Sequence, residues 1–177
     1  GGAKISGKIE VIESLLNKVD CLIIGGGMSY TFARALGGNV GISLLEPEKV
    51  ELAKSLVNKA QKKGVNLLLP IDSVNSYEFS DNKNTQVSDI SSIDSKQMGL
   101  DIGPKTISIF TNAILESGTI IWNGPMGVFE FENFSVGTKK IAESVVMASK
   151  KGAFSLVGGG DTVAAIKKYN LSKEVSY

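Results

Sequence analysis

The feature that most constrains the fold is a set of short apolar runs that each lead into glycine and are separated by amphipathic helical patterns. The runs are "CLIIGGG" from residue 21, "TIIWNGP" from residue 119 and "FSLVGGG" from residue 154. Continuous apolar runs of this length are typical of strands buried on both faces, and their alternation with helices is typical of parallel sheets. We therefore predict an α/β fold, a three-layer, Rossmann-like parallel sheet with helices on both faces.

The segments between these runs predict the other elements. Apolar residues at helical spacing predict a first helix from Ile5 to Val19, and "VNLLLP" predicts a strand stopped by proline. The further predicted helices run from about Met28 to the Gly37-Gly38 pair, between Pro47 and Gly64, and over 104–116, 135–150 and 161–169. Residues 72–97 are rich in Ser, Asn and Asp, so we expect a surface excursion with one short hairpin at most. No internal repeat occurs, and residues 1–177 predict one domain.

The glycines indicate a phosphate site. Strand carboxyl ends of a parallel sheet meet at one edge, so the three glycine-rich loops, together with the opening "GGAK", are expected to lie side by side. Glycine allows a ligand to approach the backbone, and free N–H groups at a helix start bind anions. One such loop is usually only a tight turn. Four together predict a cleft for a ligand that carries several phosphates.

Each polar side chain attached to these loops could have a structural role or a functional one. Lys4 and Lys8 are four residues apart, so on a helix both would project from one face towards a phosphate, or both would simply be solvated. Asp161 could cap a helix, or it could bind Mg²⁺, which takes one or two carboxylates together with phosphates and waters. Thr162 could cap the same helix or donate to a phosphate.

Two further polar residues follow the central run. Asn123 offers a donor and an acceptor at a strand end. Glu130 could be an exposed surface residue, or its carboxylate could accept hydrogen bonds from ribose hydroxyls.

Composition and missing motifs exclude several function classes. The chain has no histidine and a net charge of +1, so the commonest general base is absent and no basic field favours nucleic acid or a membrane. The single Cys21 fits a reducing, cytoplasmic compartment. The P-loop, the G-x-G-x-x-G fingerprint and the G-x-S-x-G elbow are all lacking. What remains is chemistry by positioning and charge, as phosphoryl transfer requires.

Several motifs, in this order, resemble one family. "GGAKIS", "IIGGGMSYTF", "MGLDIGPKT", "WNGPMGVFEFE" and "LVGGGDT" are similar to the C-terminal, nucleotide-binding domain of the phosphoglycerate kinases, and the resemblance runs essentially from end to end. It implies a monomeric glycolytic enzyme that transfers a phosphoryl group reversibly between 1,3-bisphosphoglycerate and Mg-ADP, giving 3-phosphoglycerate and ATP. The phosphoglycerate is expected to bind to a separate N-terminal domain.

The resemblance also implies residue roles. Backbone and apolar walls of an adenosine pocket are expected at Gly1, Gly2, Gly25, Gly26, Leu44 and Leu100. Contacts to adenine, ribose and the adjacent phosphate are expected at Asn123, Pro125, Val128 and Glu130. Nucleotide phosphates and the transferring group are expected at Lys4, Lys8, Gly159, Gly160 and Thr162, with Asp161 holding Mg²⁺.

The chain departs from the family's pattern in several places. Gly7 stands where the family usually has Asp, and Tyr177 where it usually has His. A strand before Gly1 and a final Ser-Thr-Gly-Gly loop are expected in the family and are not in this sequence, so we expect a piece of a longer protein that cannot catalyse transfer alone. The alternatives are a non-catalytic nucleotide-binding module, which would not need Lys4, Lys8 and Asp161, and a nicotinamide-dependent oxidoreductase, which the failed fingerprint disfavours.

Overall fold

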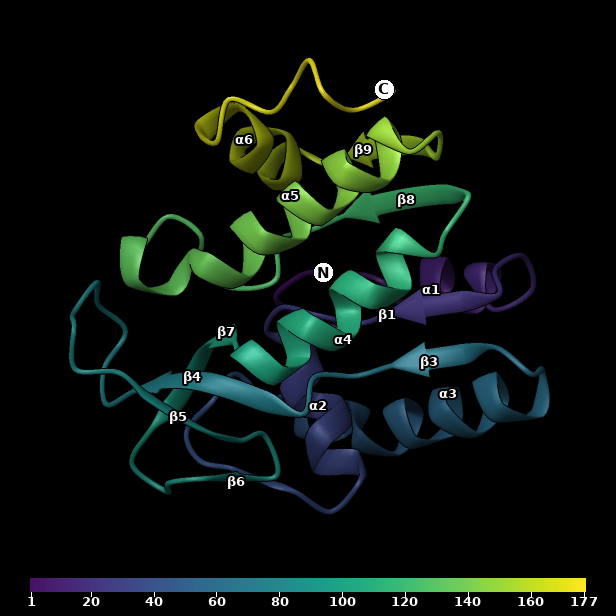
Figure 1. Cartoon of the computed structure of the whole chain (residues 1–177). Coiled ribbons are helices and arrows are strands. Elements are labelled where there is room, and N and C mark those ends of the chain that lie inside the picture. The colour runs from purple at the N-terminus through teal and green to yellow at the C-terminus, as the bar shows by residue number, and fades with distance from the viewer.

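The computed structural model describes residues 1–177 as a mixed α/β fold in which helices and strands alternate along most of the chain (Figure 1). In chain order the elements are α1 (Ile9–Leu15), β1 (Cys21–Ile23), α2 (Met28–Ala35), β2 (Asn39–Val40), η1 (Pro47–Lys49), α3 (Val50–Lys62), β3 (Asn66–Leu68), β4 (Asp72–Ser76), β5 (Gln86–Asp89), β6 (Ser92–Ile93), β7 (Met98–Ile102), α4 (Pro104–Leu115), β8 (Thr119–Asn123), η2 (Glu132–Phe134), α5 (Val136–Lys150), β9 (Phe154–Gly158) and α6 (Gly160–Lys168). The helices predicted from α2 to α6 are confirmed within a few residues at each end.

The strands form small sheets in place of the single parallel sheet that the sequence predicts. β1 pairs in parallel with β3, β8 with β9, and β2 with β6, whereas β4 is the antiparallel centre of the order β5-β4-β7. β1 and β8 each have one ladder partner, so no hydrogen-bonded strand joins the β1–β3 pair to the β8–β9 pair. The N-terminus lies between β1 and β8 in Figure 1.

The segment 72–97 is a surface excursion only in part: residues 77–96 are mostly exposed and include a β4–β5 hairpin, as predicted, but residues 72–76 are not at the surface. β4 is buried along most of its length, and Asp72, Ser73 and Asn75 are at most 2% exposed. Most of their polar groups have partners: Asp72 accepts N–H bonds at the start of α4, and the hydroxyl of Ser73 bonds that of Tyr30. The Nδ2 of Asn75 donates to the hydroxyl of Ser88 at 2.8 Å, whereas its buried Oδ1 has no partner. A buried polar strand of this kind carries no apolar run, which is why the pattern missed it.

The first helix is shorter than its apolar spacing predicts. α1 begins at Ile9, and residues 5–8 form a separate turn that precedes it. The carboxylate of Glu46 accepts the N–H groups of Ile5 and Ser6 at 2.6 and 3.2 Å, which satisfies donors that a longer helix would have left free at its first turn. Lys4 and Lys8 therefore do not share a helical face.

Two hydrophobic clusters support the glycine-rich loops. One packs α4 and α5 against β8 and β9, with Phe110 and Val145 fully buried and Trp122 at 5% exposure. The other packs α1, α2 and α3 around β1, with Phe32 fully buried. No helix of the structure has both the length and the apolar character needed to cross a bilayer.

Candidate nucleotide site

One cavity of about 310 Å³ lies where three of the four glycine-rich loops meet. These loops come from the N-terminal segment, from the end of β8 and from the β9–α6 turn. The lining residues are Gly1, Gly2, Ala3, Lys8, Asn123, Gly124, Pro125, Gly159, Gly160, Asp161 and Thr162. Most of the residues expected to hold phosphates and metal are thus brought together.

The fourth loop lies beside this cavity and does not line it. Gly25 and Gly26 are buried, and the N–H of Gly26 donates to the carbonyl of Met126 at 3.2 Å. A Cβ on Gly26 would lie 2.6 Å from backbone atoms of Gly2, and a Cβ on Gly25 would lie 2.4 Å from the sulfur of Met126. These glycines therefore allow the loops to approach one another, in addition to any approach by a ligand.

The phosphate side of the cavity has open space at the start of α6. Gly159 has φ of +89°, a conformation that favours glycine, and a Cβ on Gly160 would meet no atom within 4 Å. No side chain caps α6, so its first amides and the positive end of its dipole are free to face an anion.

The two lysines have different environments. The ammonium of Lys8 lies in the cavity and donates to Oδ1 of Asn123. Lys4 is exposed and does not line the cavity. Desolvation raises the pKa of Glu46, but the hydrogen bonds from Ser6 and Ile5, with the charge of Lys4, outweigh it and lower the pKa. The structure thus places Lys8, and not Lys4, on the candidate phosphate site.

Asp161 and Thr162, although adjacent in the sequence, also have different environments. Asp161 is exposed in the first turn of α6 and does not cap it, whereas Thr162 is fully buried and its Oγ1 accepts the N–H of Gly124 at 2.6 Å. Thr162 therefore ties the β9–α6 turn to the loop after β8. No cluster of three or more His, Cys, Asp or Glu residues is suited to holding a metal alone. A lone carboxylate fits Mg²⁺ that arrives with phosphate oxygens and waters.

Of the residues expected around the base and ribose, Gly1, Gly2, Asn123 and Pro125 line this cavity, whereas Leu44, Leu100, Val128 and Glu130 lie outside it. The N–H of Val128 donates to the carbonyl of Leu100 at 2.8 Å, so these two residues are neighbours. Leu44 is 44% exposed and its side chain packs against Gly27, while Glu130 is exposed.

Asp101 supports the site from within and was not predicted. Its Oδ2 accepts the N–H of Gly137 at 2.7 Å, in the first turn of α5, and its Oδ1 accepts that of Ile102 at 2.9 Å. Burial raises the pKa of Asp101 to about 7, against the lowering effect of these two N–H groups. Next to Gly137, Thr138 accepts the N–H of Met126 at 3.0 Å. A single acid inside the apolar "MGLDI" is the signal that could have identified Asp101.

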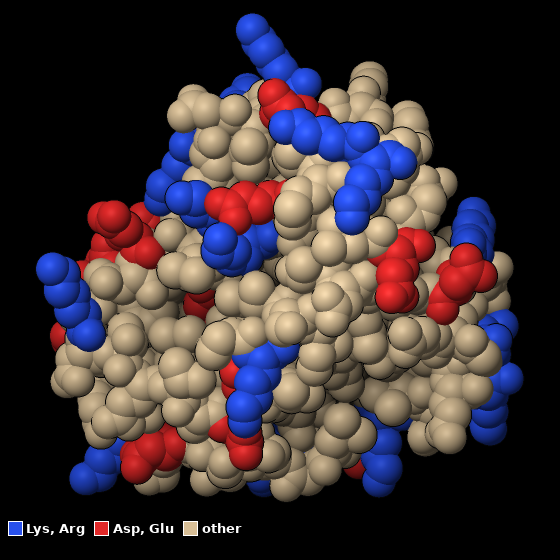
Figure 2. Space-filling model, viewed as in Figure 1, with Lys and Arg blue, Asp and Glu red and all other residues tan.

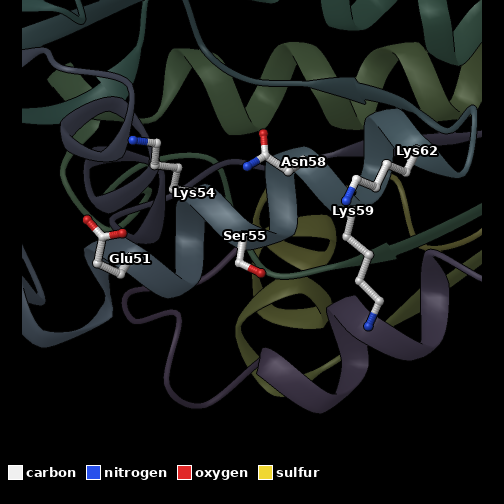
Figure 3. A pocket seen from close by; sticks show the side chains of 6 residues that line it. All are labelled: Glu51, Lys54, Ser55, Asn58, Lys59 and Lys62. Carbon is white, nitrogen blue, oxygen red and sulfur yellow. The ribbon is translucent and has the colours of Figure 1, made fainter.

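A larger hollow, of about 510 Å³, lies along α3 and is lined by Glu51, Lys54, Ser55, Asn58, Lys59 and Lys62 (Figure 3). All six residues belong to one exposed helix face, and no glycine-rich loop reaches them. Elsewhere, positive and negative side chains are interspersed over the face drawn in Figure 2. The α3 hollow is therefore the solvated face of an amphipathic helix, and the glycine-lined cavity remains the candidate site.

Comparisons with known proteins agree on one family. The family profile described as "Phosphoglycerate kinase" matches residues 1–177. The chain is 54% identical over its full length to the phosphoglycerate kinase of Porphyromonas gingivalis, of which it covers 42%, and 50% identical to that of Prochlorococcus marinus, of which it covers 44%. It therefore spans less than half the length of these curated relatives.

Solved structures give the same result. The phosphoglycerate kinase of Coxiella burnetii superposes on the whole chain with a TM-score of 0.95 at 44% identity, and the chain covers 45% of it. The enzyme of Pyrococcus horikoshii superposes with a TM-score of 0.75 at 26% identity, over 99% of this chain and 44% of that one.

Proposed function

The chain belongs to the phosphoglycerate kinase family, and from this premise we propose that it is the nucleotide-binding, C-terminal-type domain of such an enzyme. It would bind Mg-ADP or Mg-ATP for the reversible transfer of a phosphoryl group between 1,3-bisphosphoglycerate and ADP. The observation that carries this proposal is the cavity where Lys8, Asn123 and the uncapped start of α6 meet.

The proposed chemistry depends on positioning and charge. The backbone N–H groups at Gly159 and Gly160 would donate to phosphate oxygens, and their helix end adds partial positive charge. Lys8 would leave Asn123 and pair with a phosphate, while Asn123 could donate through its amide group. Asp161 would hold Mg²⁺, which offsets phosphate charge when bound. Because the transition state is largely dissociative, the absence of histidine does not weaken the assignment.

The base and ribose would bind further along the same loops. Val128 and Leu100 would supply apolar contact, with Leu44 and the glycines Gly1, Gly2, Gly25 and Gly26 on the adenosine side. Pro125 and Glu130 would complete the ribose contacts, and Lys4 would reach a phosphate only after its side chain moves from the vicinity of Glu46.

We propose that the other parts of the enzyme lie outside these 177 residues. The β1–β3 and β8–β9 pairs would be parts of one parallel sheet, joined by an extended strand between β1 and β8. A second domain would bind the phosphoglycerate, and a Ser-Thr-Gly-Gly loop would complete the phosphate site. The whole would be a cytoplasmic monomer of glycolysis, and the 177 residues alone would be inactive. A coupled assay that detects turnover by the isolated chain would contradict this last point.

Calorimetric titration tests the proposal. The chain should bind Mg-ADP, and Asp161→Ala should weaken Mg-ADP binding more than the binding of metal-free ADP. Asp20→Ala, an exposed acid before β1, is the matched control and should change neither. Equal losses for both ligands in Asp161→Ala would refute the metal role. Binding of NADH in preference to Mg-ADP would favour a nicotinamide-dependent oxidoreductase instead.

A further inference from the structure

The loop between β4 and β5 is hydrogen-bonded to the segment that follows the loop after β8. The carboxylate of Asp81 accepts the N–H groups of Glu132 and Asn133 at 2.9 and 3.0 Å, and it also accepts the side-chain amide of Asn133 at 2.7 Å. The ring of Phe79, two residues earlier, lies against that of Phe131 with centroids 5.0 Å apart. Residues some fifty positions apart in the chain thus form one joint.

Asp81 is connected through this joint to the candidate ribose contacts. Glu132 and Asn133 belong to η2, and just before them the N–H of Phe131 donates to the carbonyl of Val128 at 2.9 Å. Val128 is in turn fixed to Leu100. Residues 128–133 therefore form a chain of turns that is held at one end by β7 and at the other by Asp81.

A second contact holds the middle of this segment. The ammonium of Lys168, at the end of α6, donates to the carbonyl of Phe129 at 2.7 Å. Its charge adds to the effect of the η2 amides in lowering the pKa of Asp81. The carboxylate of Asp81 is accordingly charged at neutral pH, when its bonds to N–H donors are strongest.

We propose that Asp81 is a positioning residue, which holds Val128–Glu130 in the conformation that binds the nucleoside without touching the nucleotide itself. This inference rests on the proposed function of the cavity and the adjoining segment. Without Asp81 the end of the segment is released, and a ligand must order it at the moment of binding, which costs affinity. The phosphate contacts are proposed at the start of α6, at the other end of the helix from Lys168, so we expect them not to depend on this joint.

The test compares three probes, Mg-ADP, adenosine and Mg-pyrophosphate, by calorimetric titration of the whole chain. Asp81→Ala should weaken Mg-ADP and adenosine by the same factor, about three- to tenfold, the equivalent of one or two lost hydrogen bonds. Mg-pyrophosphate should bind unchanged. Asp81→Asn keeps one oxygen acceptor and should lose less. The matched control is Glu78→Gln, which removes an acid from the same loop whose one side-chain contact is a 3.4 Å bond from Asn82.

The direction of the change in Mg-ADP affinity distinguishes a positioning role of Asp81 from an electrostatic one. Loss of a negative group near an anionic ligand would strengthen binding, so a weaker Mg-ADP affinity cannot come from electrostatics. The inference is overturned if both Asp81 variants bind Mg-ADP and adenosine like the wild type, or if pyrophosphate weakens equally. Circular dichroism identifies a variant that does not fold, and the other variant then decides. If the wild type binds no Mg-ADP, the proposed function fails and this inference fails with it; if only the Asp81 effect is missing, the proposed function stands.

Discussion

The buried carboxyl of Asp101 gives the sharpest prediction about stability. Asp101 is 2% exposed, and its pKa is about 7 in the folded chain against an ordinary value of 3.8. The folded state therefore holds this proton between pH 4 and 7 while the unfolded state has lost it. Since stability falls with rising pH wherever the folded state binds more protons, the contribution of Asp101 is present at low pH and is lost as pH rises through 7.

The magnitude follows from the size of the shift. A difference of about three pKa units corresponds to about 4 kcal/mol of unfolding free energy between the two ends of this range, at 1.36 kcal/mol for each unit. Other carboxyl groups oppose this trend, because the pKa values of Glu46 and Asp81 are lowered by N–H donors and their contributions grow as pH rises. The dependence of wild-type stability on pH would therefore combine a contribution that falls with rising pH and contributions that grow with it.

The Asp101→Asn variant isolates the effect. We expect the free energy of unfolding in urea, measured from pH 4 to 8, to fall for the wild type relative to Asp101→Asn, by up to about 4 kcal/mol across the range. The variant's own stability at one pH is not the readout, because its amide places an NH₂ near a backbone N–H. Asp20→Asn should run parallel to the wild type. Parallel profiles for the wild type and Asp101→Asn, or a carboxyl carbon that titrates below pH 5 by NMR, would refute the reasoning.

Three further predictions concern the glycine-rich loops. Gly26→Ala should destabilise the chain by about 2 kcal/mol or more in thermal or urea unfolding, because φ is +76° and a Cβ would lie 2.6 Å from Gly2, whereas Gly7→Ala, with no atom within 4 Å, should change stability by less than about 1 kcal/mol. Thr162→Val should cost about 1–3 kcal/mol because it leaves the buried N–H of Gly124 without its acceptor, and Thr162→Ser should retain most of the stability; equal losses would show that packing and not the hydroxyl matters. Lys8→Ala should weaken Mg-ADP binding by about ten- to a hundredfold and Lys4→Ala by less, and the reverse order would contradict the placement of Lys8 in the cavity.

The buried strands and helices could be predicted from the sequence where they are built from apolar residues. The strands β1, β8 and β9 and the helices α2 to α6 have continuous or periodic apolar residues, and all were predicted. β4 and β7 were not, because β4 buries polar residues, among which Asp72 and Ser73 have partners far away in the sequence. The first helix was predicted to be too long for a similar reason. The N–H of Ile5 is bound by Glu46, an acceptor that lies far away in the sequence.

The gathering of the candidate site was also predictable in part. Glycines after parallel strands meet at one edge, so Gly1, Asn123 and Gly160 were expected together and do line one cavity. The separation of Lys4 from Lys8 was not predictable, because it follows from where α1 begins. Likewise the supporting acids Asp81 and Asp101 act through backbone amides of distant segments, and no local pattern marks such contacts.

The most direct test of the central claim is to map where Mg-ADP binds by amide NMR of the labelled chain. We predict that the amide signals of Gly159, Gly160 and Asp161 shift most on titration with Mg-ADP, together with that of Lys8, while those of Lys54 and Lys62 on α3 do not shift. Shifts confined to α3, or no shift at the start of α6 with saturating Mg-ADP, would contradict it.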